Sequence, residues 1–406
     1  MWSLRCRRCD ERYKFTPMTR GCPACRTLGV PGVLELSFCP AEIPAPQSKG
    51  HPRSRPRFLD ILPHRGTHEW TTLGEGETPL IRSKVIGPKL GLEQLYFKNE
   101  GANPTHSFKD RYAAVSVNMA QAFGFKRVVV SSTGNLGVSV AAYCAAAGLQ
   151  CLVLVLADTS SNIVEQIRLH GADIATVEPN ARQQVFERVA ERDDWFPVGL
   201  FLARDVQNPF GIEGYRPIAY EILEALGEPP AAVVFPCARG NGLYGTWKGF
   251  LDAQIWGWSS RTPAMVASQP QGANSLQVSL EQDARTPVEL ARIESVAFSA
   301  AETVADQSAL DALRHSGGRA YSAGDEEIRL ATRELALEGL FVEPSSALPV
   351  ACLGALISED IVDSEKAIIC VLTGSGAKWV AHAEASESVS HLCNDSTAVT
   401  EFLGKL

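Results

Sequence analysis

The chain alternates apolar segments of strand length with segments of helical pattern, and this alternation restricts its fold more than any other feature. The expected order is strand 121–130, helix 138–147, strand 151–156, helix 161–170, strand 173–177 and helix 181–193. Such alternation is typical of parallel sheets with helices on both faces. With 406 residues, of which 45% are hydrophobic, the chain can bury a large core. The sequence therefore predicts an α/β fold of two or three domains.

A polar loop follows the apolar strand that ends near residue 130. Its residues are Ser131, Ser132, Thr133, Gly134 and Asn135, and a helix follows. A polar loop at a helix N-terminus presents free backbone N–H groups and favours an anion, here a substrate carboxylate. The Asn135 amide could also bind a phenolic oxygen of a cofactor. The alternative interpretation is an ordinary capped helix after a strand.

A glycine-containing loop follows the apolar strand at 232–236. Its residues are Ala238, Arg239, Gly240, Asn241 and Gly242. Glycines let the backbone close around a phosphate, and Arg239 could add positive charge. The loop is not a P-loop, because no Gly-Lys-Ser/Thr follows, and it lacks the full dinucleotide fingerprint.

A third strand, 368–372, ends in the hydroxyl of Thr373 within Thr-Gly-Ser-Gly. The carboxyl end of a strand faces the usual ligand site of an open α/β sheet. Thr373 could meet the ring nitrogen of a heterocycle without protonating it. The alternative is a strand-end threonine without a ligand.

Lys109 lies in the stretch Asn-Pro-Thr-His-Ser-Phe-Lys-Asp-Arg at 103–111, just before an expected helix at 112–123. A buried amine can be kept neutral by desolvation, which makes it nucleophilic and suited to a Schiff base. Taken alone, a lysine at a helix start is more often solvated.

These four segments, in this order, resemble the fold type II pyridoxal-phosphate enzymes of the tryptophan synthase β family, and most closely their threonine synthase-like branch. The family shows similar strings around its Schiff-base lysine, its S-x-G-N-x-G loop, its phosphate loop and its T-G-x-G turn. Two further strings match, L-G-E-G-E-T-P-L at 73–80 and F-V-E-P-S-S-A at 341–347. The resemblance covers about three quarters of the chain.

The resemblance implies two open parallel-sheet domains within residues 73–406, a smaller one at about 111–202 and a larger one from the flanking segments, in a homodimer. It implies that Lys109 carries pyridoxal 5'-phosphate and acts as a base at the substrate's Cα. It also implies a set of cofactor contacts at Asn135, Ala238, Arg239, Gly240, Asn241, Gly242 and Thr373. The implied substrate contacts are Thr105, His106, Ser131, Ser132, Thr133 and Gly134.

The chain departs from the family at two places. His106 stands three residues before the lysine, where the family usually has glycine. An imidazole there is expected to face the substrate, or else to pack on the neighbouring loop. The loop at 238–242 reads Ala-Arg-Gly-Asn-Gly instead of the Gly-Asn-x-Gly-Asn common in threonine synthases.

Three activities follow from the resemblance. The first is β- or γ-replacement on an amino acid, possible substrates being O-phosphohomoserine and O-phosphoserine, in amino-acid biosynthesis. The second is β-elimination by a serine or threonine dehydratase, against which the missing tetraglycine loop counts. The third is a regulatory protein that binds the cofactor without turnover, which the combination of Lys109, Asn135 and Thr373 disfavours.

Four of the eleven cysteines form two C-x2-C pairs, Cys6 with Cys9 and Cys22 with Cys25. Two such pairs can place four thiolates around a structural Zn²⁺, although iron-binding ribbons share the spacing. We expect a zinc ribbon at 1–36 and a Pro-, Arg- and His-rich arm at 37–72. The remaining cysteines lie mostly in apolar runs, which fits a reducing cytoplasm.

Charge and hydropathy exclude other classes of protein. The net charge of −8 argues against nucleic acid as the main partner. No apolar run reaches the length of a membrane span, and the N-terminus lacks the apolar core of a signal peptide. We therefore expect a cytoplasmic enzyme with a small-molecule substrate.

Overall fold

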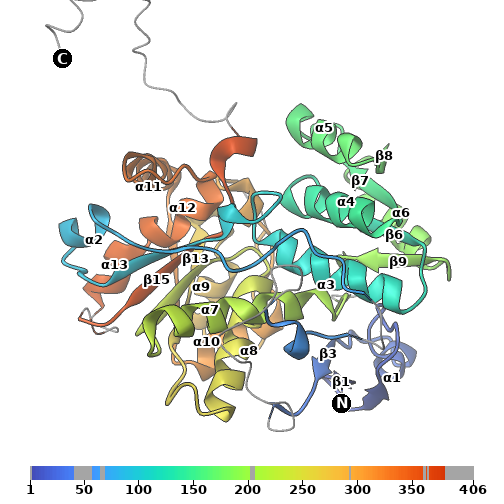
Figure 1. The fold of residues 1–406 in the computed structure, drawn as a ribbon, viewed down its shortest axis with the longest axis horizontal. Helices are drawn as coiled ribbons and strands as arrows, with labels where there is room; N and C mark the ends of the chain where they lie inside the picture. The colour runs from blue at the N-terminus through green and yellow to red at the C-terminus, as the bar shows by residue number, and fades with distance from the viewer. Residues whose placement is uncertain are drawn as a thin grey trace, which may run out of the picture.

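The computed structural model describes residues 2–40, 57–64, 69–201, 206–291, 294–359, 363 and 365–379. Two parallel sheets with helices on their faces follow a small three-stranded unit at the N-terminus (Figure 1). This arrangement confirms the predicted α/β class. Part of the expected arm at 37–72 and the end of the expected region at 73–406 lie outside the described residues.

The larger sheet has six strands in the order β14-β13-β12-β15-β5-β4. Neighbouring strands are parallel, except that β4 and β5 are antiparallel. Along β12, Val233 and Phe235 belong to one core cluster and Val234 to another, so both faces of the sheet are buried. The strands are β4 (Leu80–Arg82), β5 (Leu95–Asn99), β12 (Ala232–Pro236), β13 (Ala264–Pro270), β14 (Arg319–Ala323) and β15 (Ile368–Leu372).

The smaller sheet has four parallel strands in the order β8-β7-β6-β9. Val128 and Val130 of β6 pack into the main core, whereas Val129 packs on the opposite face with Phe186 of α6 (Arg182–Ala190). The strands are β6 (Arg127–Ser131), β7 (Gln150–Val155), β8 (Asp173–Thr176) and β9 (Trp195–Val198).

The other helices cover the two sheets and lie between them. Helix α4 packs on β6 and β7, and α12 packs on β12 and β15. The α-helices are α2 (Ile86–Lys89), α3 (Lys109–Ala122), α4 (Asn135–Ala147), α5 (Ser161–Leu169), α7 (Arg216–Leu226), α8 (Asn241–Ile255), α9 (Ser275–Glu281), α10 (Gln307–His315), α11 (Asp325–Leu337), α12 (Pro344–Ala351) and α13 (Leu353–Ser358). Short elements complete the chain: η2 (Leu59–Ile61), η3 (Glu100–Ala102), β10 (Leu200–Phe201), β11 (Val206–Gln207), η5 (Gly211–Tyr215), η6 (Gln271–Ala273), η7 (Phe298–Ala300) and η8 (Gly376–Lys378).

The N-terminal unit is an antiparallel sheet in the order β2-β1-β3 with one short helix. It packs against the larger domain through α8, where the Tyr244 hydroxyl donates a 2.7 Å hydrogen bond to Glu35. The Trp256 indole N–H also donates to the Pro40 carbonyl. Its elements are β1 (Ser3–Cys6), β2 (Arg12–Lys14), α1 (Pro23–Thr27) and β3 (Leu34–Ser37).

Several element boundaries differ from the sequence-based expectation, and helix α6 ends at Ala190, three residues before the predicted end. The strand predicted at 121–130 was wrong in its first part, because α3 runs through Ala122 and Gly124, at φ +87°, turns the chain after it. The strand then begins at Arg127. Helices α3 and α4 begin at Lys109 and Asn135, three residues before the predicted starts.

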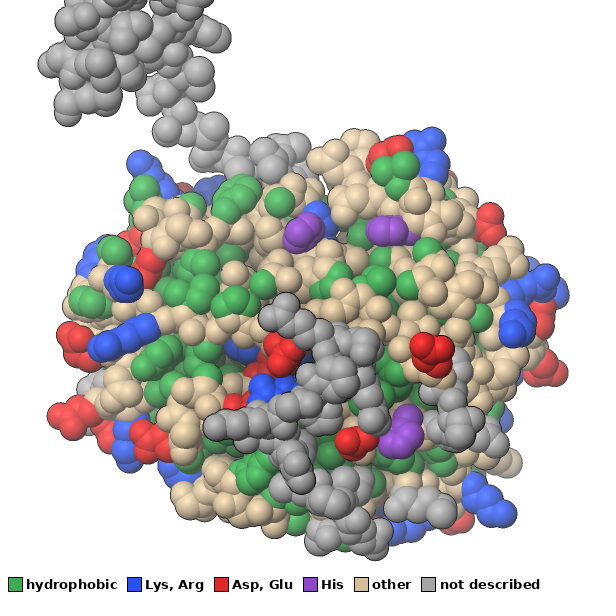
Figure 2. Space-filling model, viewed as in Figure 1, with side chains coloured by type: hydrophobic (Ala, Val, Ile, Leu, Met, Phe, Trp, Pro, Cys, Tyr) green, Lys and Arg blue, Asp and Glu red, His purple; other side chains and the backbone are tan. Residues whose placement is uncertain are grey.

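Acidic and basic side chains are interspersed around the rim of the face shown in Figure 2, in keeping with the modest net charge of −8. No helix in the described part of the chain is both long enough and apolar enough to cross a membrane.

Candidate functional site

The lysine loop lies directly against the Thr-Gly-Ser-Gly turn, although the two are more than 260 residues apart in sequence. The Phe108 amide donates a 2.8 Å hydrogen bond to the Thr373 carbonyl, and the Ser375 amide donates to the His106 carbonyl at 3.0 Å. These backbone bonds fix the position from which α3 begins. The loop that carries Lys109 is therefore bonded to the turn that carries Thr373.

Lys109 is the first residue of α3, and its side chain is half-buried. Its Nζ lies 4.3 Å from the centre of the Phe108 ring. Burial lowers the pKa of Lys109 to about 8, while the charges of Glu343 and Glu302 act in the opposite direction. A lysine with this pKa is partly neutral near physiological pH, as a nucleophilic amine requires.

Asn135 and Glu343 meet in the same place, 208 residues apart in sequence. The Asn135 Nδ2 donates a 3.0 Å hydrogen bond to Glu343, and the Asn135 Oδ1 is buried with no partner among the described residues. Burial raises the pKa of Glu343, against the effects of Asn135, Lys378, Trp379 and Lys109. Glu343 was not predicted as a site residue, although the matched string at 341–347 contains it.

Thr373 follows β15, and its side chain is buried. Its hydroxyl lies 3.0 Å from the Ser346 hydroxyl, which in turn accepts a 2.7 Å hydrogen bond from the Gly374 amide. The Thr373 hydroxyl therefore has a fixed position and carries no charge.

The glycine loop leads directly into α8. Gly240 has φ +87°, and a Cβ atom there would lie 2.3 Å from the Cβ of Ala309. A Cβ on Gly242 would lie 2.5 Å from the Phe235 ring. Both positions therefore require glycine. Ala238 precedes this crowded turn.

The polar side chains of this loop already have partners. Arg239 NH2 lies 2.6 Å from an Asp306 carboxylate oxygen. Asn241, the first residue of α8, exchanges hydrogen bonds with Gln207. A phosphate at this loop would therefore meet mainly the backbone N–H groups at the start of α8.

The loop before α4 is shaped by serine hydroxyls. The Ser132 hydroxyl accepts hydrogen bonds from the amides of Gly134 and Gly137, at 3.3 and 3.0 Å. The Ser131 hydroxyl accepts a 2.7 Å bond from Nε of Arg182, a residue that the sequence analysis did not single out. Thr133 is half-buried.

Thr105 points into its own loop. Its hydroxyl donates a 2.5 Å hydrogen bond to Asp110, whose other oxygen accepts from the Thr105 amide. The Thr105 carbonyl accepts a 2.5 Å bond from Nζ of Lys378. Lys378 is a buried lysine that was not predicted as a site residue, and burial lowers its pKa to about 8.

His106 has φ +64°, in the left-handed region, and its side chain is exposed. This backbone conformation explains why glycine is common here in the family, and histidine is one of the few other residues that adopts it with some frequency. The left-handed conformation is therefore kept at this position without glycine.

We expect His106→Gly to lower turnover about tenfold or to change substrate preference, because an exposed imidazole beside Lys109 can hydrogen-bond an anionic substrate group. His106→Asn is the matched control for the backbone, since asparagine also tolerates a positive φ. Steady-state kinetics over a substrate panel measures turnover and substrate preference in both variants. Cofactor absorbance shows whether each variant still binds the cofactor. Kinetic constants equal to wild type in both variants would leave His106 with a packing role only.

The four predicted ribbon cysteines converge. Their sulfur atoms all lie within 4.8 Å of one another, with Cys6 to Cys25 and Cys9 to Cys22 both at 3.7 Å. Zn–S bonds of about 2.3 Å in a tetrahedron place sulfur atoms about 3.8 Å apart. The geometry of the donors therefore fits one tetrahedral metal ion.

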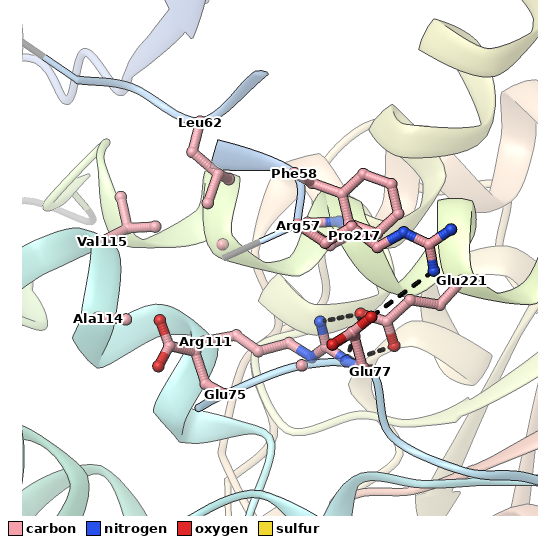
Figure 3. A pocket seen from close by; sticks show the side chains of 12 residues that line it. Arg57, Phe58, Leu62, Glu75, Glu77, Arg111, Ala114, Val115, Pro217 and Glu221 are labelled. Carbon is pink, nitrogen blue, oxygen red and sulfur yellow. Dashed lines mark hydrogen bonds and ion pairs between the residues drawn. The ribbon is translucent and has the colours of Figure 1, made fainter. Parts of the chain in front are cut away.

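A separate pocket lies beside a buried ionic cluster at the base of α3 (Figure 3). It has about 30 Å³ of free space, and its lining includes Arg57, Glu75 and Glu77. In the cluster, Arg111 bridges Glu100 and Glu221 with hydrogen bonds of 2.7 to 2.8 Å. Arg111 follows Lys109 by two residues in α3, so the ion pairs of the cluster stabilise the start of this helix.

Comparison with known proteins shows to which family the chain is similar. A family model described as "pyridoxal-phosphate dependent enzyme" matches residues 71–374. The chain is 34% identical to the threonine synthase of Methanocaldococcus jannaschii over 386 residues, or 92% of each chain. It is 30% identical to that of Methanosarcina acetivorans, over 98% of this chain and 96% of the other.

Solved structures share the fold. Threonine deaminase isoform 2 from Solanum lycopersicum has a TM-score of 0.65 at 21% identity, covering 77% of this chain and 89% of that one. Maize serine racemase has a TM-score of 0.63 at 21% identity, covering 81% and 92%. These two likenesses show the common architecture of the sheets.

Proposed function

Because the chain belongs to the family of pyridoxal-phosphate dependent enzymes, we propose that it catalyses a β- or γ-replacement of the threonine synthase kind. The proposed substrate is an amino acid with a phosphorylated side chain, such as O-phosphohomoserine or O-phosphoserine. The proposal is supported by the similarity to a threonine synthase over nine tenths of the chain. It is also supported by the Phe108–Thr373 backbone bond beside Lys109 and by the bond of Asn135 to Glu343, on whose pKa Lys109 acts.

The residues at the site fit the cofactor. The backbone N–H groups at Gly240, Asn241 and Gly242, with the dipole of the 15-residue α8, would hold its phosphate. The cofactor supplies an electron-withdrawing ring that stabilises negative charge at the substrate's Cα. Lys109 would bind it covalently and, once released by the substrate amine, remove the Cα proton.

Asn135 and Glu343 would act together at the phenolic oxygen of the cofactor. The raised pKa of Glu343 favours a protonated carboxyl group, which can donate to an amide oxygen. With its amide turned by about 180°, Asn135 would accept from Glu343 with Oδ1 and direct an N–H group to the position where Oδ1 is now unpaired. The phenolic oxygen would then receive that N–H group.

The uncharged hydroxyl of Thr373 would face the ring nitrogen. A hydroxyl cannot protonate the ring as a carboxylic acid can, so the ring withdraws fewer electrons. An unprotonated ring nitrogen would favour loss of a leaving group and addition of a nucleophile over transamination. The substrate carboxylate would bind the N-terminus of α4, with Ser132 shaping the loop and Thr133 beside it.

A substrate screen tests this function. Purified holoenzyme is given O-phosphohomoserine, O-phosphoserine, O-acetylserine, serine and threonine, and both product formation and the cofactor spectrum are followed. We expect a phosphorylated amino acid to be the preferred substrate. Preference for serine or threonine, with ammonia and a keto acid as products, would instead identify a dehydratase.

We propose that the ribbon cysteines hold one structural zinc. Cys6, Cys9, Cys22 and Cys25 supply four sulfur ligands, and the Tyr13 hydroxyl lies 3.1 Å from the sulfur of Cys22. A site with four protein ligands has no open position for a substrate. The zinc would therefore stabilise the unit that packs on α8.

We expect Cys22→Ser to remove the zinc, about one ion per chain, because a hydroxyl replaces one of four thiolates. Metal analysis measures the loss, and the melting temperature should fall. Cys39→Ser, an exposed cysteine outside the ligand set, is the matched control. A zinc content equal to wild type in Cys22→Ser would contradict the assignment, and iron in the purified protein would correct the identity of the metal.

A further inference from the structure

Arg182 crosses from α6 to the end of β6 and so reaches the predicted substrate loop. It is the first residue of α6, and its Nε donates a 2.7 Å hydrogen bond to the Ser131 hydroxyl. Ser131 is the last residue of β6 and directly precedes the loop 132–134. The Nε bond anchors the guanidinium group and leaves its two terminal nitrogen atoms for other partners.

Arg182 has no carboxylate within ion-pair distance among the described residues. Its side chain is half-buried, and its hydrogen-bond partner among the described residues is Ser131. Burial lowers the pKa of Arg182, and the charge of Glu302 opposes this effect. A guanidinium group without an ion pair keeps its positive charge available to an anionic ligand.

The charge of Glu302 acts on the pKa values of both Arg182 and Lys109. Desolvation raises the pKa of Glu302, although its side chain keeps access to solvent, and Arg239, Arg182 and Lys109 oppose this rise. The same carboxylate is therefore within electrostatic reach of Arg182 from the smaller sheet and of Lys109 at the cofactor site. The 2.7 Å bond to Ser131 places Arg182 at the end of β6, directly before the loop 132–134.

The other cations that the structure describes at the site are already engaged. Arg239 is paired with Asp306, and Lys378 donates to the Thr105 carbonyl between Glu343 and Asp110. Lys109 is assigned to the cofactor. Arg182 is therefore the cation best placed to meet a negative charge on the substrate side chain.

We propose that Arg182 is a specificity-determining residue that binds the distal anionic group of the substrate. The shared chemistry is an oxyanion, either the phosphate ester of a phospho-amino acid or a side-chain carboxylate. Two terminal nitrogen atoms in a fixed plane match two oxygen atoms of either group. This inference rests on the proposed function and names the residue that would select its substrate.

Glu302 limits the strength of this anion site. A carboxylate near the guanidinium group repels a bound anion, and most strongly a phosphate dianion. The two residues should therefore have opposite effects: loss of Arg182 weakens binding of the anion, and Glu302→Gln strengthens it. If Arg182 only stabilised the end of β6, the two substitutions would not have opposite effects on anion binding.

The test compares Arg182→Gln, Glu302→Gln and Arg188→Gln in the holoenzyme. Arg188 is an exposed arginine of the same helix, so Arg188→Gln removes the same charge outside the proposed site. We expect Arg182→Gln to raise KM about 10- to 100-fold for O-phosphohomoserine or O-phosphoserine and to leave KM for O-acetylserine nearly unchanged. Aspartate is included to separate a carboxylate from a phosphate ester. Equal losses for charged and uncharged leaving groups, or no loss, would overturn the proposal.

Calorimetric binding of inorganic phosphate to the holoenzyme separates this proposal from the proposed function. If wild type turns over none of these amino acids, the proposed function fails, while phosphate binding still tests Arg182. Weaker phosphate binding in Arg182→Gln and tighter binding in Glu302→Gln would support the anion site. Equal phosphate affinity in all three variants would reject it.

Discussion

Lys109→Arg should leave a folded protein that has lost covalent attachment of the cofactor and at least about a thousandfold of turnover. A guanidinium group keeps the positive charge at the start of α3, but it is not deprotonated in proteins and forms no imine. The visible absorbance of the lysine-bound cofactor should disappear. The absorbance spectrum of the purified variant and its activity measure the two losses.

Lys378 provides a demanding control, because it is a buried lysine whose pKa burial also lowers to about 8. The two amines differ in their contacts. Lys378 donates to the Thr105 carbonyl, and the charges of Glu343 and Asp110 act on its pKa, whereas the Lys109 Nζ lies over the Phe108 ring. Borohydride reduction followed by peptide mapping should label Lys109. A label on Lys378 would overturn the assignment of the catalytic lysine.

The lowered pKa of Lys109 predicts how the cofactor-free protein takes up pyridoxal phosphate. With a pKa of about 8, about one amine in eleven is neutral at pH 7, against about one in 2,500 for an ordinary lysine. Only the neutral amine attacks the aldehyde, so the rate of attachment should rise with pH and level off above about pH 8. A rate that still rises steeply at pH 10 would show an unperturbed lysine.

The motifs predicted the site residues that lie next to one another in sequence. Strings at 103–111, 131–137, 238–242 and 373–376 each form a loop beside a helix or at a strand end, and such loops have a local signature. The resemblance to a family supplied their order and the α/β class. Gly240 and Gly242 could be predicted because a Cβ atom at either position would clash, and sequence patterns record such a requirement.

Arg182 and Glu302, which lie outside these strings, had no motif by which the sequence could have indicated them. Arg182 starts an ordinary amphipathic helix, and Glu302 lies in a segment without a motif. The role proposed for them depends on the tertiary arrangement, which joins the start of α6 to the end of β6 and lets the charge of Glu302 act on the pKa of Arg182 and Lys109. The expected strand at 121–130 was wrong in part because Phe123 and Phe125 pack beside the main core around the turn at Gly124.

Arg111→Met should lower the free energy of unfolding by about 3–5 kcal/mol, the largest stability effect that we expect from one substitution. Arg111 is 3% exposed and bridges Glu100 and Glu221, which are 0% and 8% exposed. Without the guanidinium group, two buried carboxylates share only Lys98, which pairs with Glu221 at 2.5 Å. Methionine fills a similar volume, so the loss comes mainly from the uncompensated charge.

Arg127→Met is the matched control, because Arg127 pairs with Asp194 on the surface, where both side chains are 44% exposed. An exposed pair contributes about 0–1 kcal/mol, so this variant should unfold almost as wild type does. Urea unfolding followed by circular dichroism measures both variants. Equal losses in the two would show that the buried cluster has no special role.

The pH dependence of this difference identifies its electrostatic origin. Arg111 helps to hold the pKa values of Glu100 and Glu221 below those of unfolded carboxyl groups, despite their burial. Such groups stabilise the fold above the unfolded pKa of about 4.3 and lose this contribution as the pH falls through their folded values. In Arg111→Met the same carboxyls should bind protons more readily, so acid relieves their repulsion. The gap in stability between wild type and Arg111→Met should therefore narrow from pH 7 to pH 4.5, whereas a gap caused by lost packing would stay constant.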